Sequence, residues 1–173
     1  MTKAETTTDW FLYRNTPPLR IVGGSELSVA FNVYDVPVRE RLLLKQYRIW
    51  QKDVEATFDR EYSSAMLRSP DHMIFLTAMV HLQRMAYIWI CCELAGTYEA
   101  EAPEKFKIWP ISMNCSMPSL VRESCDVIQT LKVVSFDARA DGGYLMAGVS
   151  TVGEGIRIEA TAVVFSLDVP REL

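Results

Sequence analysis

Two hydrophobic patterns divide this chain, and their order along it predicts the fold. Before residue 65 apolar side chains tend to recur at every second position, as Val29, Phe31 and Val33 do. This alternation is typical of strands with one buried face. The predicted strands are 26–34, 47–50 and 54–62, the last two turning at 52–53, while 38–45 fits either a short helix or the start of a strand.

The segment from Pro70 to Ala95 has a different pattern and predicts one long helix. Ser69 suits the cap position, Pro70 the first helical position, and Gly96 the end of the helix. About 26 residues rising about 1.5 Å each would make a rod roughly 39 Å long. Apolar side chains occupy nearly every side of it, so we expect another element, most simply a sheet, to surround it.

After the helix the alternating pattern returns and predicts four more strands. Asp141-Gly142-Gly143 and Gly153-Glu154-Gly155 are hairpin signals between the last three of them. Strands, one buried helix and then an antiparallel meander are typical of an α+β hotdog fold, in which an antiparallel sheet wraps around one long central helix. The four predicted strands are 107–115, 125–138, 144–152 and 156–167.

Composition limits the functional classes. Of the 173 residues 49% are hydrophobic and 23% charged, and the formal net charge is −4, so we expect one globular domain over 19–173 preceded by a loose arm over 1–18. The acidic balance lacks a basic stripe and argues against a nucleic-acid partner. The longest uninterrupted apolar run in the helix covers eight residues, against the ~18 of a membrane span, so no membrane partner is expected.

Cysteine usage and targeting signals favour a cytoplasmic protein without a metal. The four cysteines lack metal-ligand spacing, and adjacent Cys91 and Cys92 make a poor disulfide. Residues 1–9 are polar and lack the apolar core of a secretory leader. We therefore predict reduced thiols, no metal site and no cofactor, with Cys91 and Cys92 as packing residues rather than nucleophiles.

The residues Ala65-x-x-Arg68-Ser69-x-x-His72, with Ala86-Tyr87 further along, resemble the FcoT-like family of long-chain fatty acyl-CoA thioesterases. The resemblance is best over 65–96. It implies a hotdog enzyme that lacks the usual carboxylate and uses tyrosine and asparagine groups near this helix. By position it implies Tyr87 as a site tyrosine and Gln83 in place of an asparagine, whereas Met66 and Ile74 stand where the family has polar residues.

Helical geometry gives an independent prediction for the same residues. At 100° per residue, Gln83 and Tyr87 share one stripe, about 6 Å apart along the axis, and His72 lies on that stripe roughly 16 Å from Gln83. An amide on an apolar helix needs a partner, which is either a strand backbone or a substrate carbonyl or water. His72 is either a group bonded near the helix start or a general base. His81 lies on the opposite side and is expected to be structural.

The predicted site therefore combines catalytic and substrate-binding residues. Strand ends before the helix supply Asp59 and Tyr62, for which a solvated strand edge is the alternative. The catalytic candidates are Gln83, Tyr87 and His72, and the substrate-binding candidates are Met66, Ser69, Ile74, Met79, Asp59 and Tyr62.

The resemblance implies hydrolysis of an acyl thioester carried by coenzyme A or an acyl carrier protein. Two alternatives stay open. One is dehydration or conjugate addition on an enoyl or hydroxyacyl thioester in a biosynthetic pathway, and the other is a non-catalytic acyl-binding or scaffold protein. Because a curled sheet has edges that need covering, we also predict a homo-oligomer, most simply a homodimer.

Overall fold

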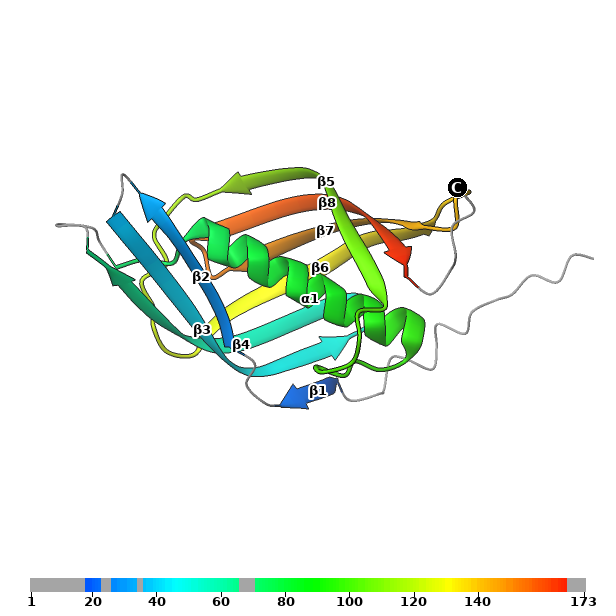
Figure 1. Cartoon of the computed structure of the whole chain (residues 1–173), viewed down its shortest axis with the longest axis horizontal. Helices are drawn as coiled ribbons and strands as arrows, with labels where there is room; N and C mark the ends of the chain where they lie inside the picture. Colours follow the sequence, from blue (N-terminus) through cyan, green and yellow to red (C-terminus); the bar gives the residue numbers. More distant parts are fainter. Residues whose placement is uncertain (1–17, 23–25, 34–35, 66–70, 168–173) are drawn as a thin grey trace, which may run out of the picture.

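The computed structural model describes residues 18–22, 26–33, 36–65 and 71–167. All strand pairings among these residues are antiparallel, and the sheet runs in the order β1-β3-β4-β6-β7-β8-β5, with β2 pairing with β3. In Figure 1 this sheet curves around α1, so the predicted hotdog fold is confirmed. The elements are β1 (Leu19–Val22), β2 (Glu26–Val33), β3 (Val36–Trp50), β4 (Asp53–Ser64), α1 (Phe75–Ala95), β5 (Phe106–Ser116), β6 (Val127–Ala138), β7 (Tyr144–Val152) and β8 (Ile156–Ser166).

The predicted strands agree with these bounds to within a few residues, except 47–50, which is only the end of the longer strand β3. The ambiguous segment 38–45 belongs to β3, which continues without a break to Trp50. The short strand β1 was not predicted, and it pairs with the second half of β3. The predicted division into an arm over 1–18 and a domain over 19–173 stays a prediction, because residues 1–17 lie outside the described residues.

The predicted start of the helix is wrong and the predicted end is right. Helix α1 begins at Phe75, and Ile74 occupies the cap position in an extended conformation without a side-chain cap. Ser69 and Pro70 lie outside the described residues. At the other end, Gly96 has a φ of 73°, a left-handed conformation that glycine adopts without a steric penalty.

Helix α1 is covered on most sides but not on all of them, so the prediction that it is surrounded is met only in part. Met85, Ile88 and Ile90 are completely buried against the sheet, whereas Phe75 and Val80 are exposed. By length and composition α1 is apolar enough to cross a membrane, but 56% of that stretch is buried inside the protein, as in a core helix. One face of the helix is therefore open in the single chain.

Three β-bulges interrupt the ladders of β3, β5 and β6. Each inserts one extra residue between two paired ones: Lys45 in β3, Ile111 in β5 and Val134 in β6. Ile111 and Val134 are exposed, as is Lys45. Bulges bend strands and increase their twist, which helps this sheet to curve around a helix.

The segment 117–126, which joins β5 to β6, runs back to the start of the helix and to β4. The Met73 N–H donates to the Val121 carbonyl at 2.7 Å, and the Arg60 N–H donates to the Ser124 carbonyl at 2.7 Å. A Cβ at Gly155 would lie 2.4 Å from Val121, so this close approach requires glycine there. The segment thus joins the helix start to two distant parts of the sheet.

Candidate functional site

An apolar cavity of about 170 Å³ lies between α1 and the strands β5 to β8. Cavities of this size, when lined by apolar side chains, hold a molecule such as benzene. Among the described residues that line it, none carries an ionisable side chain. Its larger apolar lining residues are Leu76, Met79, Leu82, Ile108, Met113, Leu131 and Met146.

The cavity adjoins a second, more polar depression on the open side of α1. Val80, Gln83 and Ile108 line both, so these three residues mark the junction. The second depression has a volume of about 350 Å³. Its polar lining includes Arg84, Tyr87, Tyr98, Glu99, Glu104 and Lys107. An elongated ligand could therefore place an apolar end in the cavity and a polar remainder in the depression.

Gln83 lies at this junction and is exposed. The prediction of a buried amide in need of a partner is therefore wrong, because the sheet does not cover this side of the helix. An exposed amide keeps its N–H groups and its carbonyl oxygen available for a ligand. Met79, one turn earlier, lines the cavity as a substrate-binding residue would.

Tyr87 connects the helix to the segment that follows it. Its hydroxyl oxygen accepts a hydrogen bond from the Lys105 N–H at 3.0 Å, and its ring packs edge-on against Tyr98 with centroids 6.3 Å apart. Burial raises the pKa of the Tyr87 hydroxyl, so the phenol stays protonated at neutral pH. These contacts make Tyr87 a residue that positions the wall of the polar depression.

Other predicted residues lie together at the start of the helix, away from the cavity lining. The rings of His72 and Tyr62 are 6.4 Å apart between centroids. Ile74 is buried, and its backbone N–H donates to the Glu40 carboxylate. Met66 and Ser69 lie outside the described residues.

Asp59 belongs to a third location. Its carboxylate pairs with Lys45 at 2.6 Å and accepts a hydrogen bond from the Asp126 N–H at 2.9 Å. The hydrogen bond from Lys45 is the main reason that the pKa of Asp59 is lowered. The structure thus brings Met79, Gln83 and Tyr87 together, and His72 with Tyr62, but leaves Asp59 outside both groups.

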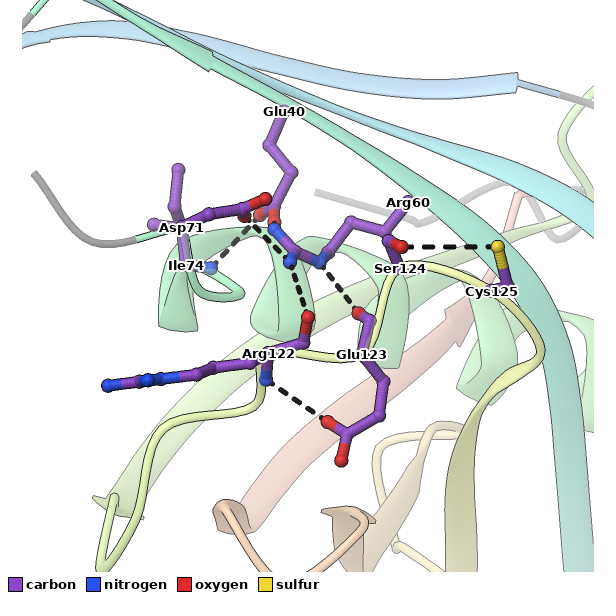
Figure 2. A network of polar contacts seen from close by, with 8 residues as sticks. All are labelled: Glu40, Arg60, Asp71, Ile74, Arg122, Glu123, Ser124 and Cys125. Carbon is purple, nitrogen blue, oxygen red and sulfur yellow. Dashed lines mark hydrogen bonds and ion pairs between the residues drawn. The ribbon is translucent and has the colours of Figure 1, made fainter.

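A charged cluster that was not predicted, with two of its three side chains buried, holds the helix start (Figure 2). Arg60 donates to Glu40 at 3.1 Å and pairs with Asp71 at 2.8 Å, and the side chains of Arg60 and Glu40 are completely buried. Arg60 also donates to the carbonyls of Glu123 and Arg122. Glu40 accepts the Ile74 N–H at 3.0 Å, so a carboxylate from the sheet replaces the missing cap of α1. We call Glu40, Arg60 and Asp71 the charged cluster.

Burial is the largest influence on Glu40 and raises the pKa of its carboxyl. The Ile74 N–H and the guanidinium of Arg60 act in the opposite direction and favour the carboxylate. Because neither Glu40 nor Arg60 has exposed side-chain surface, no substrate reaches them in this conformation. We interpret this pair as structural.

A second buried cluster is neutral and lies under the middle of α1. His81 Nδ1 donates to the Gln129 side-chain oxygen at 2.9 Å, and the Gln129 amide donates to the Ala78 carbonyl and to the Ser150 hydroxyl. The Tyr47 hydroxyl lies 3.2 Å from His81 Nε2, which is left to accept its proton. We call Tyr47, His81, Gln129 and Ser150 the neutral cluster. It confirms that His81 is structural.

Strand alternation carried a signal for both clusters. Glu40 lies on the same face as Leu42 and Leu44, and Arg60 on the same face as Phe58, all of them buried. A charged residue at an inward-facing position of each of two strands indicates a buried pair. Gln129 stands in the same way between Val127 and Leu131, so each of these polar residues was recognisable from its position alone.

Comparisons with known proteins give distant structural likenesses. No family model and no curated protein matches the sequence. A thioesterase from Haemophilus influenzae is 12% identical, with a TM-score of 0.45 over 76% of this chain and 82% of that chain. A sigma28-regulated virulence protein from Campylobacter jejuni is 13% identical, with a TM-score of 0.42 over 74% of this chain and 78% of that chain. Likenesses this remote do not establish a family, so the resemblance to the FcoT-like family stays a prediction.

Proposed function

We propose that this protein hydrolyses an acyl thioester, with the acyl group in the apolar cavity and the thioester carbonyl beside Gln83. The observation that carries the proposal is the position of Gln83, an exposed amide at the junction of the cavity and the polar depression. A thioester is divided in the same way as this apolar cavity and polar depression, because its apolar acyl group joins a polar carrier arm at the carbonyl. The resemblance of residues 65–96 to acyl thioesterases agrees with this arrangement.

The chemistry that Gln83 can supply is polarisation and orientation. Its N–H groups would donate to the carbonyl oxygen, where negative charge develops as water attacks the carbonyl carbon. Its own oxygen would accept a hydrogen bond from that water. Collapse of the tetrahedral intermediate breaks the C–S bond and gives a carboxylic acid and a thiol. Tyr87 holds the wall of the depression through Lys105 and acts as a positioning residue.

The carrier is either coenzyme A or an acyl carrier protein, and both would present the same polar arm to the depression. Arg84 and Lys107 in the depression would face that arm. Glu99 and Glu104 also line the depression, so its lining carries charges of both signs. His72 and Tyr62 lie at the helix start, and we propose no contact between them and the thioester carbonyl.

A second candidate function is acyl binding without catalysis. The observation that favours it is the lining of the cavity, where no described residue is ionisable and no general base is at hand. Under this alternative Gln83 would fix the orientation of the bound thioester and leave it intact.

Turnover of acyl and hydroxyacyl thioesters of coenzyme A and of N-acetylcysteamine, followed by mass spectrometry, tests the proposal. Free acid indicates hydrolysis, loss of water indicates dehydration, and an unchanged mass with measurable binding indicates the second candidate. Gln83→Ala should lower the rate of hydrolysis by about 10²–10³, as removal of one transition-state donor does. Because Gln83 is exposed, the melting temperature should not change.

Glu93→Ala is the matched control, since Glu93 is exposed on the same helix and does not line the cavity. Its turnover should equal that of the wild type. Full activity of Gln83→Ala, or an equal loss in Glu93→Ala, would contradict the role given to Gln83.

A further inference from the structure

The cavity exists because three of the four residues in two neighbouring rows of the sheet have small side chains or none. Gly148 on β7 pairs with Ala160 on β8, and in the next row Met146 pairs with Ala162. All four line the cavity. The side chains that face the helix are therefore smallest at Gly148 and Ala160, and the space between sheet and helix is widest there.

The rows on either side are filled. Ile158 pairs with Ser150 in one flanking row, and Val164 pairs with Tyr144 in the other. Ile158, Ser150 and Val164 have no exposed surface. Adjacent rows on one face are about 6.6 Å apart along a strand, so the two filled rows, which are three rows apart, lie about 20 Å from each other.

The neighbouring Leu131 limits the size of the residue that can stand at position 148. A Cβ added there would lie 3.0 Å from Leu131 Cδ1, and Leu131 is itself a buried wall of the cavity. A larger residue at 148 would push Leu131 into the space. The cavity size thus depends on Gly148 and Ala160 together.

From this geometry we propose that the site selects a compact acyl group of about six carbons, a chain or one ring, and that Ala160 and Gly148 determine its size. The comparison with benzene-sized cavities gives the number. The volume of the cavity, about 170 Å³, therefore sets the limit on chain length. This inference rests on the proposed function only in that the acyl group arrives as a thioester, and it departs from the long-chain substrates that the family resemblance implies.

Binding of non-hydrolysable thioethers tests the inference separately from catalysis. We would measure by calorimetry the Kd of S-butyl, S-hexyl, S-decyl and S-tetradecyl N-acetylcysteamine. Each methylene up to about six carbons should tighten binding about fourfold, as burial of a methylene does, and further carbons should add nothing. Tenfold tighter binding of the decyl than of the hexyl compound would overturn the proposal.

Three variants locate the size limit. Ala160→Leu should weaken hexyl binding at least tenfold, whereas Ala147→Leu, which lies next to Gly148 and does not line the cavity, should leave it unchanged. Met146→Ala, which shortens a large side chain that lines the cavity, should let the decyl compound gain affinity over the hexyl one. If Ala160→Leu does not fold, the chain-length series of wild type and Met146→Ala decides alone, and equal series for the two would refute a size limit set by the cavity.

Turnover of hexanoyl, decanoyl and tetradecanoyl thioesters separates the two proposals. A binding limit near six carbons without turnover of any thioester would leave the size inference standing and remove the hydrolase. Hydrolysis that is fastest with the tetradecanoyl thioester would keep the hydrolase and overturn the size inference.

Discussion

The charged cluster and the neutral cluster solve the same problem in different ways. Both place polar side chains at inward-facing strand positions, where an unpaired polar group is costly. The charged cluster satisfies Arg60 with Glu40, Asp71 and two carbonyls, and thereby joins the helix start to β3, β4 and the segment 117–126. The neutral cluster satisfies His81 and Gln129 with hydrogen bonds between groups that carry no formal charge.

This difference teaches that the two clusters should fail in different ways. Removing one partner of a buried ion pair leaves an uncompensated charge, which is among the largest single-residue effects. Acid alone can disrupt the neutral cluster. Its hydrogen bonds require an uncharged His81 ring, and protonation of the ring would remove the acceptor at Nε2. The charged cluster should therefore be sensitive to mutation and the neutral cluster to pH.

The largest effect is expected from Arg60→Met. This change keeps most of the apolar stem but removes the cation, so Glu40 stays buried without its partner. We expect the free energy of unfolding to fall by about 3–5 kcal/mol, measured by urea denaturation. The double variant Glu40→Leu with Arg60→Met removes both charges and should lose less than the single variant. A loss well below 1 kcal/mol for Arg60→Met would show that the cluster does not hold the helix start.

Acid should unfold the protein through His81. Burial lowers the pKa of His81 to about 4, against an ordinary value of about 6.5 in the unfolded chain. Because the unfolded chain takes up the proton more readily, stability is complete above pH 6.5 and falls as the pH drops toward 4. The loss attributable to this residue is about 3 kcal/mol.

Urea denaturation between pH 7 and pH 4 measures this loss. Other groups also titrate there, so the relevant quantity is the difference in slope between wild type and His81→Gln. The variant starts less stable but should lose less stability on acidification. Identical slopes would mean that His81 is not held neutral in the folded state.

The smallest effect is expected at the exposed ion pair of Lys45 with Asp59 and Asp126. Water and salt screen exposed pairs, and two long side chains lose freedom when they pair. Lys45→Ala should therefore leave the denaturation midpoint within the scatter of repeated measurements, in low and in high salt. A clear loss would mean that this pair behaves like the buried pair of Arg60 and Glu40.

The fold could be predicted because its signals are local and periodic. Alternation located the strands, and Gly96 located the end of the helix. The start of the helix could not be predicted from local signals, because its cap is Glu40, which is 34 residues away from Ile74 in the sequence. A cap that comes from a distant part of the chain produces no signal in the sequence next to the helix.

The candidate site could be predicted only in part, because its geometry depends on what the sheet leaves uncovered. The helical stripe correctly placed Gln83 and Tyr87 on one side of α1. It gave the wrong burial for Gln83, since periodicity shows which residues share a face but not which face the sheet covers. The cavity depends on the pairing of Gly148 with Ala160, and this register of β7 and β8 could not be predicted from the sequence pattern.

The bulge at Lys45 affects how the length of β3 can vary. Leu44 and Tyr47 both face inward although three positions separate them, because Lys45 is the extra residue between paired ones. Losing Lys45 would leave every neighbour on its present face, whereas losing a residue such as Arg41 would turn the inward and outward sides of the strand around. We therefore expect a deletion at Lys45 to be tolerated better than one elsewhere in β3, because it would not exchange core positions for surface positions.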